Sequence, residues 1–187
     1  ALNETNGNMD EAVEFLRKNG QAKAEKKASR IAAEGLCMVV TKDDQTAAVV
    51  EVNSETDFVA KNATFQEFVK AVATQAVNSD AADMDAFMAE KWNEDASKTV
   101  SEALVEKVAV IGENLKIRRF EKVVAEHGCV VPYVHGGGRI GVIVDADTDV
   151  VNDTVKEAMH NIAMQIAALN PKYVSRDEVS ADYIAHE

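Results

Sequence analysis

One helical pattern occurs twice in this sequence, ninety residues apart. TFQEFVKAVATQAV (Thr64–Val77) aligns with TVKEAMHNIAMQIA (Thr154–Ala167), and four of the fourteen positions are identical, against roughly one expected from average composition. The apolar positions also match, pairing Phe65 with Val155, Val69 with Met159 and Val72 with Ile162. In each half an apolar strand pattern precedes the helix. The repeat therefore predicts an α+β fold of two related subdomains, each a small antiparallel sheet covered by helices on one face.

The segments around the repeat give the expected domain boundaries. NMDEAVEFLRKNG (Asn8–Gly20) is typical of an amphipathic helix that Asn8 caps, with Glu11 reaching back to the cap and Asn19-Gly20 ending the helix. We expect residues 1–20 to be part of an N-terminal helical domain and residues 21–34 to be a helical linker. The first core subdomain is then expected over residues 35–125 and a truncated second one over residues 126–187.

Composition excludes several classes of function. The chain has 187 residues and a net charge of -12, which disfavours nucleic acid as a partner because phosphate neutralisation needs a basic surface. A short basic segment, Lys23 to Arg30, contains Glu25 and is typical of a solvated helix face. No apolar run approaches the length of about eighteen residues that spans a bilayer, so we expect no membrane insertion. Cys37 and Cys129 are far apart and lack ligand spacing, which predicts reduced thiols without structural zinc.

The glycine run VHGGGRI, Val134–Ile140, is the first candidate for chemistry. It matches neither the dinucleotide-binding pattern nor the phosphate loop, and a strand pattern follows it where a helix is needed. We therefore predict a hairpin turn with His135 exposed at its edge. His135 has no evident nucleophile beside it, and no histidine spacing predicts a metal site. The sequence indicates neither a metal site nor an enzyme, although a small acidic enzyme that uses His135 remains an alternative.

The segment Thr56-Asp57-Phe58 is the second candidate. Thr56 or Asp57 can cap a helix that begins near Phe58, and Phe58 can then anchor the turn to the core. The alternative is that Phe58 enters a partner's pocket. Two observations favour insertion of Phe58 into a partner. Other residues already provide apolar side chains for the core in this region, and the matching turn in the second half, Asp145–Asp153, contains no aromatic residue.

Three segments in order along the chain resemble hallmark segments of bacterial elongation factor Ts. They are TDFVAKN (Thr56–Asn62) after EVNSE, IGENLKIRR (Ile111–Arg119) and YVHGGGRIGV (Tyr133–Val142). The opening residues and AMHNIAMQIAALNPKYV (Ala158–Val174) are also similar, so the resemblance covers nearly the whole chain. It implies an N-terminal domain of the ubiquitin-associated type, followed by a core of two similar α+β subdomains.

The same resemblance implies a function. Members of this family exchange the guanine nucleotide of elongation factor Tu, a translation GTPase, and need no cofactor of their own. Carried over to this chain, Phe58 is a wedge beside the partner's magnesium site, Asp57 its polar neighbour, and Thr56 and Val59 its supports. Ile111, Gly112 and His135 match further positions that contact the partner. The resemblance thus implies a cytoplasmic, non-enzymatic exchange factor that binds the GTPase in its GDP-bound and nucleotide-free forms.

Compared with the family, the chain is expected to be a fragment. It begins within the second helix of the N-terminal domain and ends before the coiled coil and the closing part of the second subdomain. Self-association is left open. An adaptor without exchange activity, suggested by the N-terminal helix, is the remaining alternative.

Overall fold

Two antiparallel β-hairpins form the centre of the fold in the computed structural model, which describes residues 1–186. β1 (Glu34–Thr41) pairs with β2 (Thr46–Ser54), and β5 (Lys116–Val124) pairs with the other edge of β2 to complete a three-stranded sheet. β6 (Cys129–His135) and β7 (Ile140–Ala146) form a separate two-stranded sheet. Both sheets are antiparallel and helices accompany each, which confirms the predicted α+β class.

Helices cover one face of the three-stranded sheet. α3 (Ala63–Asn78) lies on β1 and β2, and its buried face includes Phe65, Phe68 and Val72. The short helix α2 (Asp57–Ala60) precedes it, and α4 (Met84–Ala89) and α5 (Val100–Ile111) complete this layer. A small ribbon of β3 (Lys91–Trp92) and β4 (Asp95–Thr99) joins these two helices. Most of the buried apolar residues belong to this single core.

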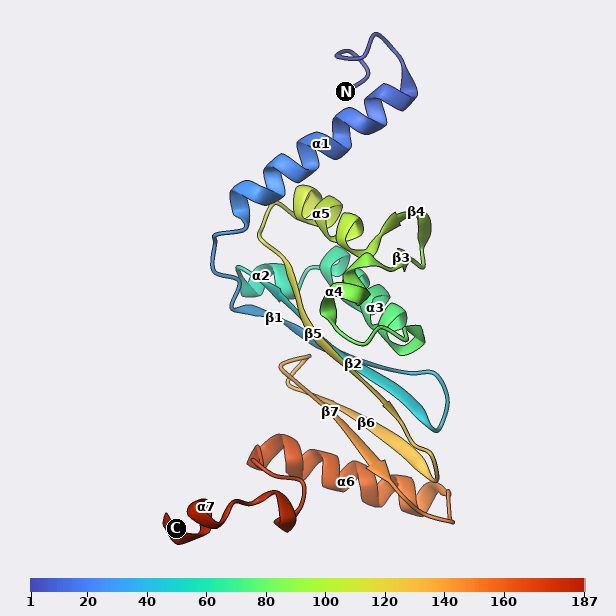
Figure 1. The fold of residues 1–187 in the computed structure, drawn as a ribbon, viewed down its shortest axis with the longest axis vertical. Helices are drawn as coiled ribbons and strands as arrows, with labels where there is room; N and C mark the ends of the chain where they lie inside the picture. Colours follow the sequence, from blue (N-terminus) through green and yellow to red (C-terminus); the bar gives the residue numbers. More distant parts are fainter. Residues whose placement is uncertain (187) are drawn as a thin grey trace.

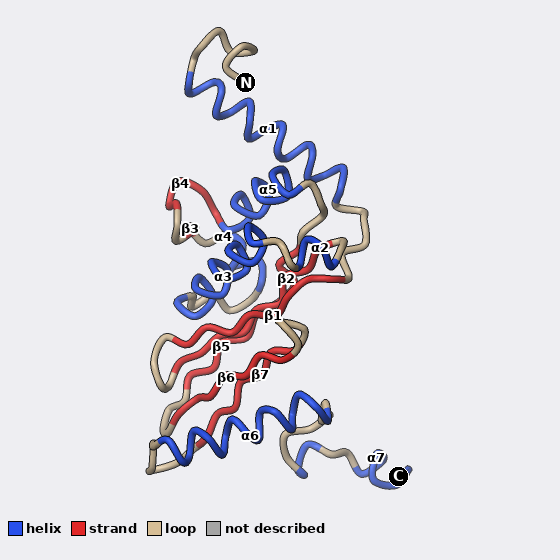
Figure 2. The backbone as a smooth tube through the Cα atoms, turned by 180° about the vertical axis from the view of Figure 1, so that it is seen from behind, coloured by secondary structure: helices blue, strands red, loops and turns tan. Residues whose placement is uncertain are grey.

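The β6–β7 hairpin lies on the opposite face of the three-stranded sheet. A Cβ added to Gly141 would come within 2.9 Å of Val49 Cγ2 and 3.2 Å of Cys37 Cβ, so the two sheets are in close contact at this glycine. α6 (Asp153–Leu169) covers the outer face of the hairpin. The order of layers is therefore helices, sheet, hairpin and helix, as Figures 1 and 2 show.

The repeated helices differ in how deeply they are buried. Val72 of α3 is fully buried, whereas its counterpart Ile162 in α6 is 51% exposed. Met159 and Ala163 do face the β6–β7 hairpin as the shared register predicts. Ile162 is less buried because α6 packs mainly on the two-stranded β6–β7 hairpin, whereas α3 lies on a three-stranded sheet and next to α5.

The N-terminal helix is longer than the sequence predicts. Asn8 caps α1 (Met9–Lys27) through its side chain, as expected, but its backbone N–H donates to Thr5 O at 2.9 Å rather than to Glu11. The predicted stop at Asn19-Gly20 was wrong, since the helix continues for two further turns. Gly20 is buried, and a Cβ on it would lie 3.8 Å from Ala109 Cβ of α5. The contact with α5 outweighs the local preference of Asn-Gly for ending a helix.

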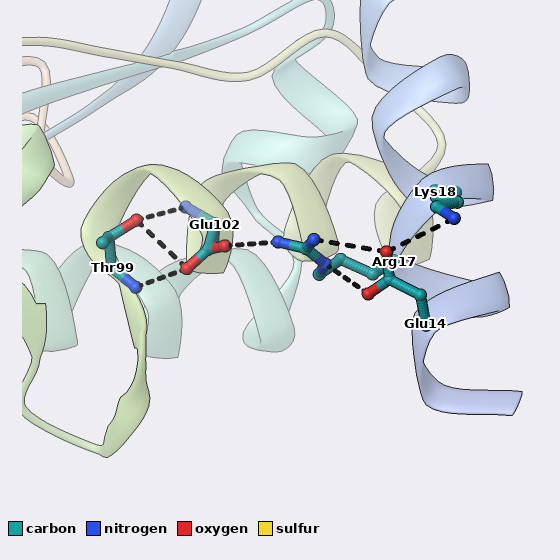
Figure 3. A network of polar contacts seen from close by, with 5 residues as sticks. All are labelled: Glu14, Arg17, Lys18, Thr99 and Glu102. Atoms are coloured by element: carbon teal, nitrogen blue, oxygen red, sulfur yellow. Dashed lines mark hydrogen bonds and ion pairs between the residues drawn. The ribbon is translucent and has the colours of Figure 1, made fainter. Parts of the chain in front are cut away.

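An ion-pair network joins α1 to α5 (Figure 3). Arg17 donates to Glu14 one turn earlier and to Glu102 Oε1 of α5 at 2.9 Å. Glu102 also completes a capping box, because its Oε2 accepts from Thr99 N–H at 2.9 Å while Thr99 Oγ1 accepts from the N–H of Glu102. Glu102 therefore both completes the capping box of α5 and pairs with Arg17 of α1.

The C-terminal segment continues beyond α6 through a 3-10 turn, Arg176–Glu178, to α7 (Ala181–His186). Asn170 ends α6 in the left-handed conformation, directly before Pro171. None of the helices in the described part of the chain has both the length and the apolar character that crossing a membrane requires.

His127 connects the two loops at the far end of the β6–β7 hairpin. Its Nδ1 lies 2.6 Å from Asp147 Oδ1 and its Nε2 lies 3.1 Å from Asp149 Oδ1. The hydrogen bond to Asp147 raises the pKa of His127 above its ordinary value of 6.5. A raised folded-state pKa means that this contact stabilises the fold fully below the unfolded pKa and is lost as pH rises through the folded pKa.

We therefore expect the substitution His127→Gln to destabilise the chain at about pH 5.5 and to have little effect at about pH 8.5. The effect is expected to be small, because the imidazole is exposed. Urea unfolding of both proteins at the two pH values measures the difference. An equal difference at both values contradicts a role for the imidazolium charge.

Candidate functional site

The antiparallel topology brings the three candidate segments to one end of the three-stranded sheet. Glu34 of β1 pairs with Ser54 of β2, and Asn53 pairs with Lys116 of β5. The start of β1, the end of β2 and the start of β5 therefore lie side by side. The Phe58 turn follows β2 and the Ile111–Gly112 corner precedes β5, so segments more than fifty residues apart become neighbours.

The Phe58 turn is a single capped helical turn. Thr56 is the N-cap of α2, and its Oγ1 accepts from Val59 N–H at 3.4 Å. Val59 and Ala60 contact the core, whereas Phe58 is 80% exposed. The interpretation of Phe58 as the core anchor was therefore wrong, because Val59 and Ala60 fill that role. The cap by Thr56 is confirmed.

Asp57 lies next to Phe58 on the surface of the same turn. Its carboxylate accepts from Lys61 Nζ at 2.7 Å, one helical turn further on. The hydrogen bond to Lys61 lowers the pKa of Asp57 below its ordinary value, so Asp57 carries its negative charge at neutral pH. The turn thus presents an exposed aromatic ring beside an ion pair.

The carboxylate of Glu113 binds the Phe58 turn from the other segment. Its Oε2 accepts from the backbone N–H groups of Glu55 at 3.0 Å and Thr56 at 3.1 Å, and its Oε1 accepts from Thr56 Oγ1 at 2.7 Å. In return, Glu55 Oε1 accepts from the backbone N–H of Asn114 at 2.6 Å. Each of the two adjacent loops therefore contributes a carboxylate that accepts hydrogen bonds from the other loop. We call this set of bonds among Glu55, Thr56, Glu113 and Asn114 the carboxylate clamp.

Ile111 and Gly112 form the corner at which α5 ends. Gly112 has a φ of 86°, the left-handed conformation that glycine adopts without strain, and its N–H donates to Val108 O. Ile111 is half-buried and contacts the core, while Gly112 is exposed. The corner directs the chain straight into Glu113 and Asn114 of the carboxylate clamp.

The glycine run forms the predicted hairpin turn between β6 and β7. Gly136, Gly137 and Gly138 all have positive φ, and the tip contacts the start of β1, where Cys37 N–H donates to Gly138 O at 2.6 Å. His135 is exposed at the last position of β6, as predicted. Its Nδ1 lies 2.8 Å from the hydroxyl of Tyr133, a contact that helps to orient the ring and uses one of its two nitrogens.

An open groove of about 700 Å³ separates the Phe58 turn from the glycine hairpin. Its lining includes Asp57 and Lys61 from the Phe58 turn and the next loop, Gly136 to Arg139 from the glycine hairpin, and Cys37 of β1. Burial raises the pKa of the Cys37 thiol above its ordinary value, so it stays protonated at neutral pH and is a poor nucleophile. Within residues 1–186 no cluster of histidine, cysteine and acidic side chains could hold a metal ion.

Sequence reasoning missed the residues that support this end of the sheet. Glu55 and Glu113 lie inside the quoted segments, but nothing local indicates that they face each other. Their bonds join residues 57 to 59 positions apart. The available signal was a pair of acids placed directly before a helix cap and directly after a helix-ending glycine, both at predicted strand ends.

These features define the class of the chain. It is an α+β protein in which an exposed phenylalanine and a helix corner lie at one end of the three-stranded sheet and an exposed histidine lies at the end of β6.

The family model described as "Elongation factor TS" matches residues 55–187, so the chain belongs to the elongation factor Ts family. Over its full length the chain is 53% identical to elongation factor Ts of Clostridioides difficile, 48% to that of Halothermothrix orenii and 46% to that of Trichlorobacter lovleyi. It spans 61% to 62% of the length of these relatives.

Proposed function

We propose that this chain binds elongation factor Tu carrying GDP, disturbs its magnesium and phosphate site, and promotes GDP release so that GTP can bind. The observation that carries the proposal is the exposure of Phe58 on a capped turn fixed by Glu113. Membership of the elongation factor Ts family supports the choice of partner. The proposal places the chain in the cytoplasm, where translation occurs, with neither nucleic acid nor membrane as a direct partner.

The proposed mechanism is thermodynamic linkage. If the chain and magnesium-bound GDP strain the same site of the GTPase, each weakens the binding of the other by the same factor. A thousandfold weakening corresponds to about 4 kcal/mol of coupling. Magnesium is the main positive charge on bound phosphates, so displacing its ligands is an effective way to loosen the nucleotide.

Phe58 alone does not supply this coupling energy. Burying one phenylalanine side chain is worth about 1.5 to 3 kcal/mol, which is less than the coupling required. The proposal therefore assigns the remainder to Ile111 and Gly112, which precede β5, and to His135 at the end of β6, next to the glycine turn that contacts β1. His135 offers a ring nitrogen for a hydrogen bond, and the Ile111–Gly112 corner offers apolar and backbone contact.

Release of a fluorescent GDP analogue from elongation factor Tu tests the proposal. The labelled complex is mixed with excess unlabelled GDP, with and without the chain, and the release rate is followed at rising concentrations of the chain. We expect the rate to rise and then saturate. A rate that does not change while binding is still detected contradicts exchange activity and supports the adaptor alternative.

A further inference from the structure

We propose that Glu113 is a positioning residue that joins the Phe58 turn and the Ile111–Gly112 corner into one rigid block. The inference rests on the proposed function, because it concerns how the chain presents Phe58 to the GTPase. Glu113 itself stays beneath the exposed surface: it is half-buried, and its carboxylate already accepts from two backbone N–H groups and one hydroxyl of this chain.

The contacts of Glu113 hold the two residues directly before the helical turn that carries Phe58, namely Glu55 and the N-cap Thr56. The backbone N–H groups of Glu55 and Thr56 immediately precede α2, and neither is paired within the helix, since they come before its first turn. Thr56 Oγ1 donates to Glu113 while it accepts from Val59 N–H. The cap of the turn is therefore oriented by a side chain from another segment, and the hydroxyl links the two.

The opposite half of the carboxylate clamp prevents the two loops from moving apart. Glu55 accepts from Asn114 N–H at 2.6 Å, and the Asn114 side chain donates to Arg30 O at 2.7 Å. Arg30 in turn lies 3.5 Å from the Glu55 carboxylate. The linker before β1, the loop after β2 and the loop before β5 are thus joined, and the bond from Asn114 N–H to the Glu55 carboxylate is charge-assisted, which is the stronger kind of hydrogen bond.

A rigid block matters because the proposed exchange depends on position. A turn of four helical residues has little stability of its own, so its conformation depends on tertiary contacts. A flexible turn could still bury Phe58 in a partner, but it would lose conformational entropy when it becomes ordered on binding. It would also transmit less strain to the nucleotide site. The expected signature of losing Glu113 is therefore a lower saturating release rate.

The test compares four variants in the GDP release assay, Glu113→Ala, Glu113→Gln, Phe58→Ala and the double variant of Glu113→Ala with Phe58→Ala. Glu157→Ala, an exposed glutamate on α6, serves as the matched control. We expect Glu113→Ala to lower the saturating rate about tenfold or more, and Glu113→Gln to retain most of it, because the amide oxygen still accepts from both backbone N–H groups. The double variant is expected to lose less than the product of the two single losses, because part of the effect of Glu113 is exerted through Phe58 and part through the Ile111–Gly112 corner.

Amide hydrogen exchange of the free chain provides a second measurement that does not depend on the GTPase. Ala60 N–H donates to Thr56 O at 3.3 Å and closes the turn, so it should exchange faster in Glu113→Ala than in Glu157→Ala. If Glu113→Ala does not fold, Thr56→Val replaces it, with Thr56→Ser as the variant that keeps the hydroxyl.

The outcomes separate the two proposals. Unchanged Ala60 exchange, or losses from Glu113→Ala and Phe58→Ala that multiply in the double variant, overturns the positioning role. If the unmodified chain fails to accelerate GDP release, the proposed function fails, and Ala60 exchange then decides alone whether Glu113 holds the turn.

Discussion

Phe58→Ala is expected to slow saturated GDP release from elongation factor Tu by about 10- to 100-fold, the equivalent of one buried phenylalanine side chain. The same substitution is expected to leave the free energy of unfolding almost unchanged, because the ring is 80% exposed and the core is filled by its neighbours. Stopped-flow release of a fluorescent GDP analogue measures the first effect, and urea unfolding measures the second.

Ile31→Ala is the matched control for this experiment. Ile31 is also a large exposed apolar residue, but it lies in the linker before β1 and belongs to none of the three segments at the candidate site. We expect it to release GDP at the rate of the unmodified chain. Equal losses for the two substitutions contradict a specific role for Phe58, because they show that any exposed apolar side chain has the same influence.

Phe65→Ala is expected to produce the opposite pattern, with a loss of about 3 to 5 kcal/mol in the free energy of unfolding. Phe65 is fully buried between α3 and the three-stranded sheet, and its removal leaves a cavity in the main core. Under conditions where the variant remains folded, GDP release is expected to saturate at the normal rate. Chemical denaturation measures the stability, and the loss of native circular dichroism gives the midpoint.

Ile162→Ala tests the asymmetry of the repeat in the same assay. Ile162 matches buried Val72 in the alignment of the two helices, yet it is half-exposed in α6. We expect it to cost less than about 1 kcal/mol, as for other partly exposed positions. A cost as large as that of Phe65→Ala is incompatible with the observed packing of α6.

Local sequence patterns predicted the main elements because those elements depend on local chemistry. The apolar period of α3 and α6 placed both helices, and valine-rich runs placed the strands of both hairpins. Asn8 and Thr56 were recognisable as caps because a cap needs only the adjacent N–H groups. The polar ribbon of β3 and β4 was missed, since segments such as Asp95–Thr99 lack the usual strand residues.

Features that depend on long-range contacts were outside the reach of sequence patterns. Gly20 reads as a helix end, and only the contact with α5 shows why α1 continues through it. The candidate site follows the same rule. Phe58 was identified as a candidate from its turn and from the family resemblance, whereas Glu113 was not, because its role depends on a neighbour 57 positions away.

The central claim is that binding of this chain and binding of magnesium-bound GDP oppose each other on elongation factor Tu. Titration calorimetry of the chain against the nucleotide-free GTPase and against its GDP-magnesium form measures this coupling directly. We expect tighter binding to the nucleotide-free form, by the same factor by which the chain weakens GDP, and a smaller factor for Phe58→Ala. Equal affinity for the two forms contradicts the account.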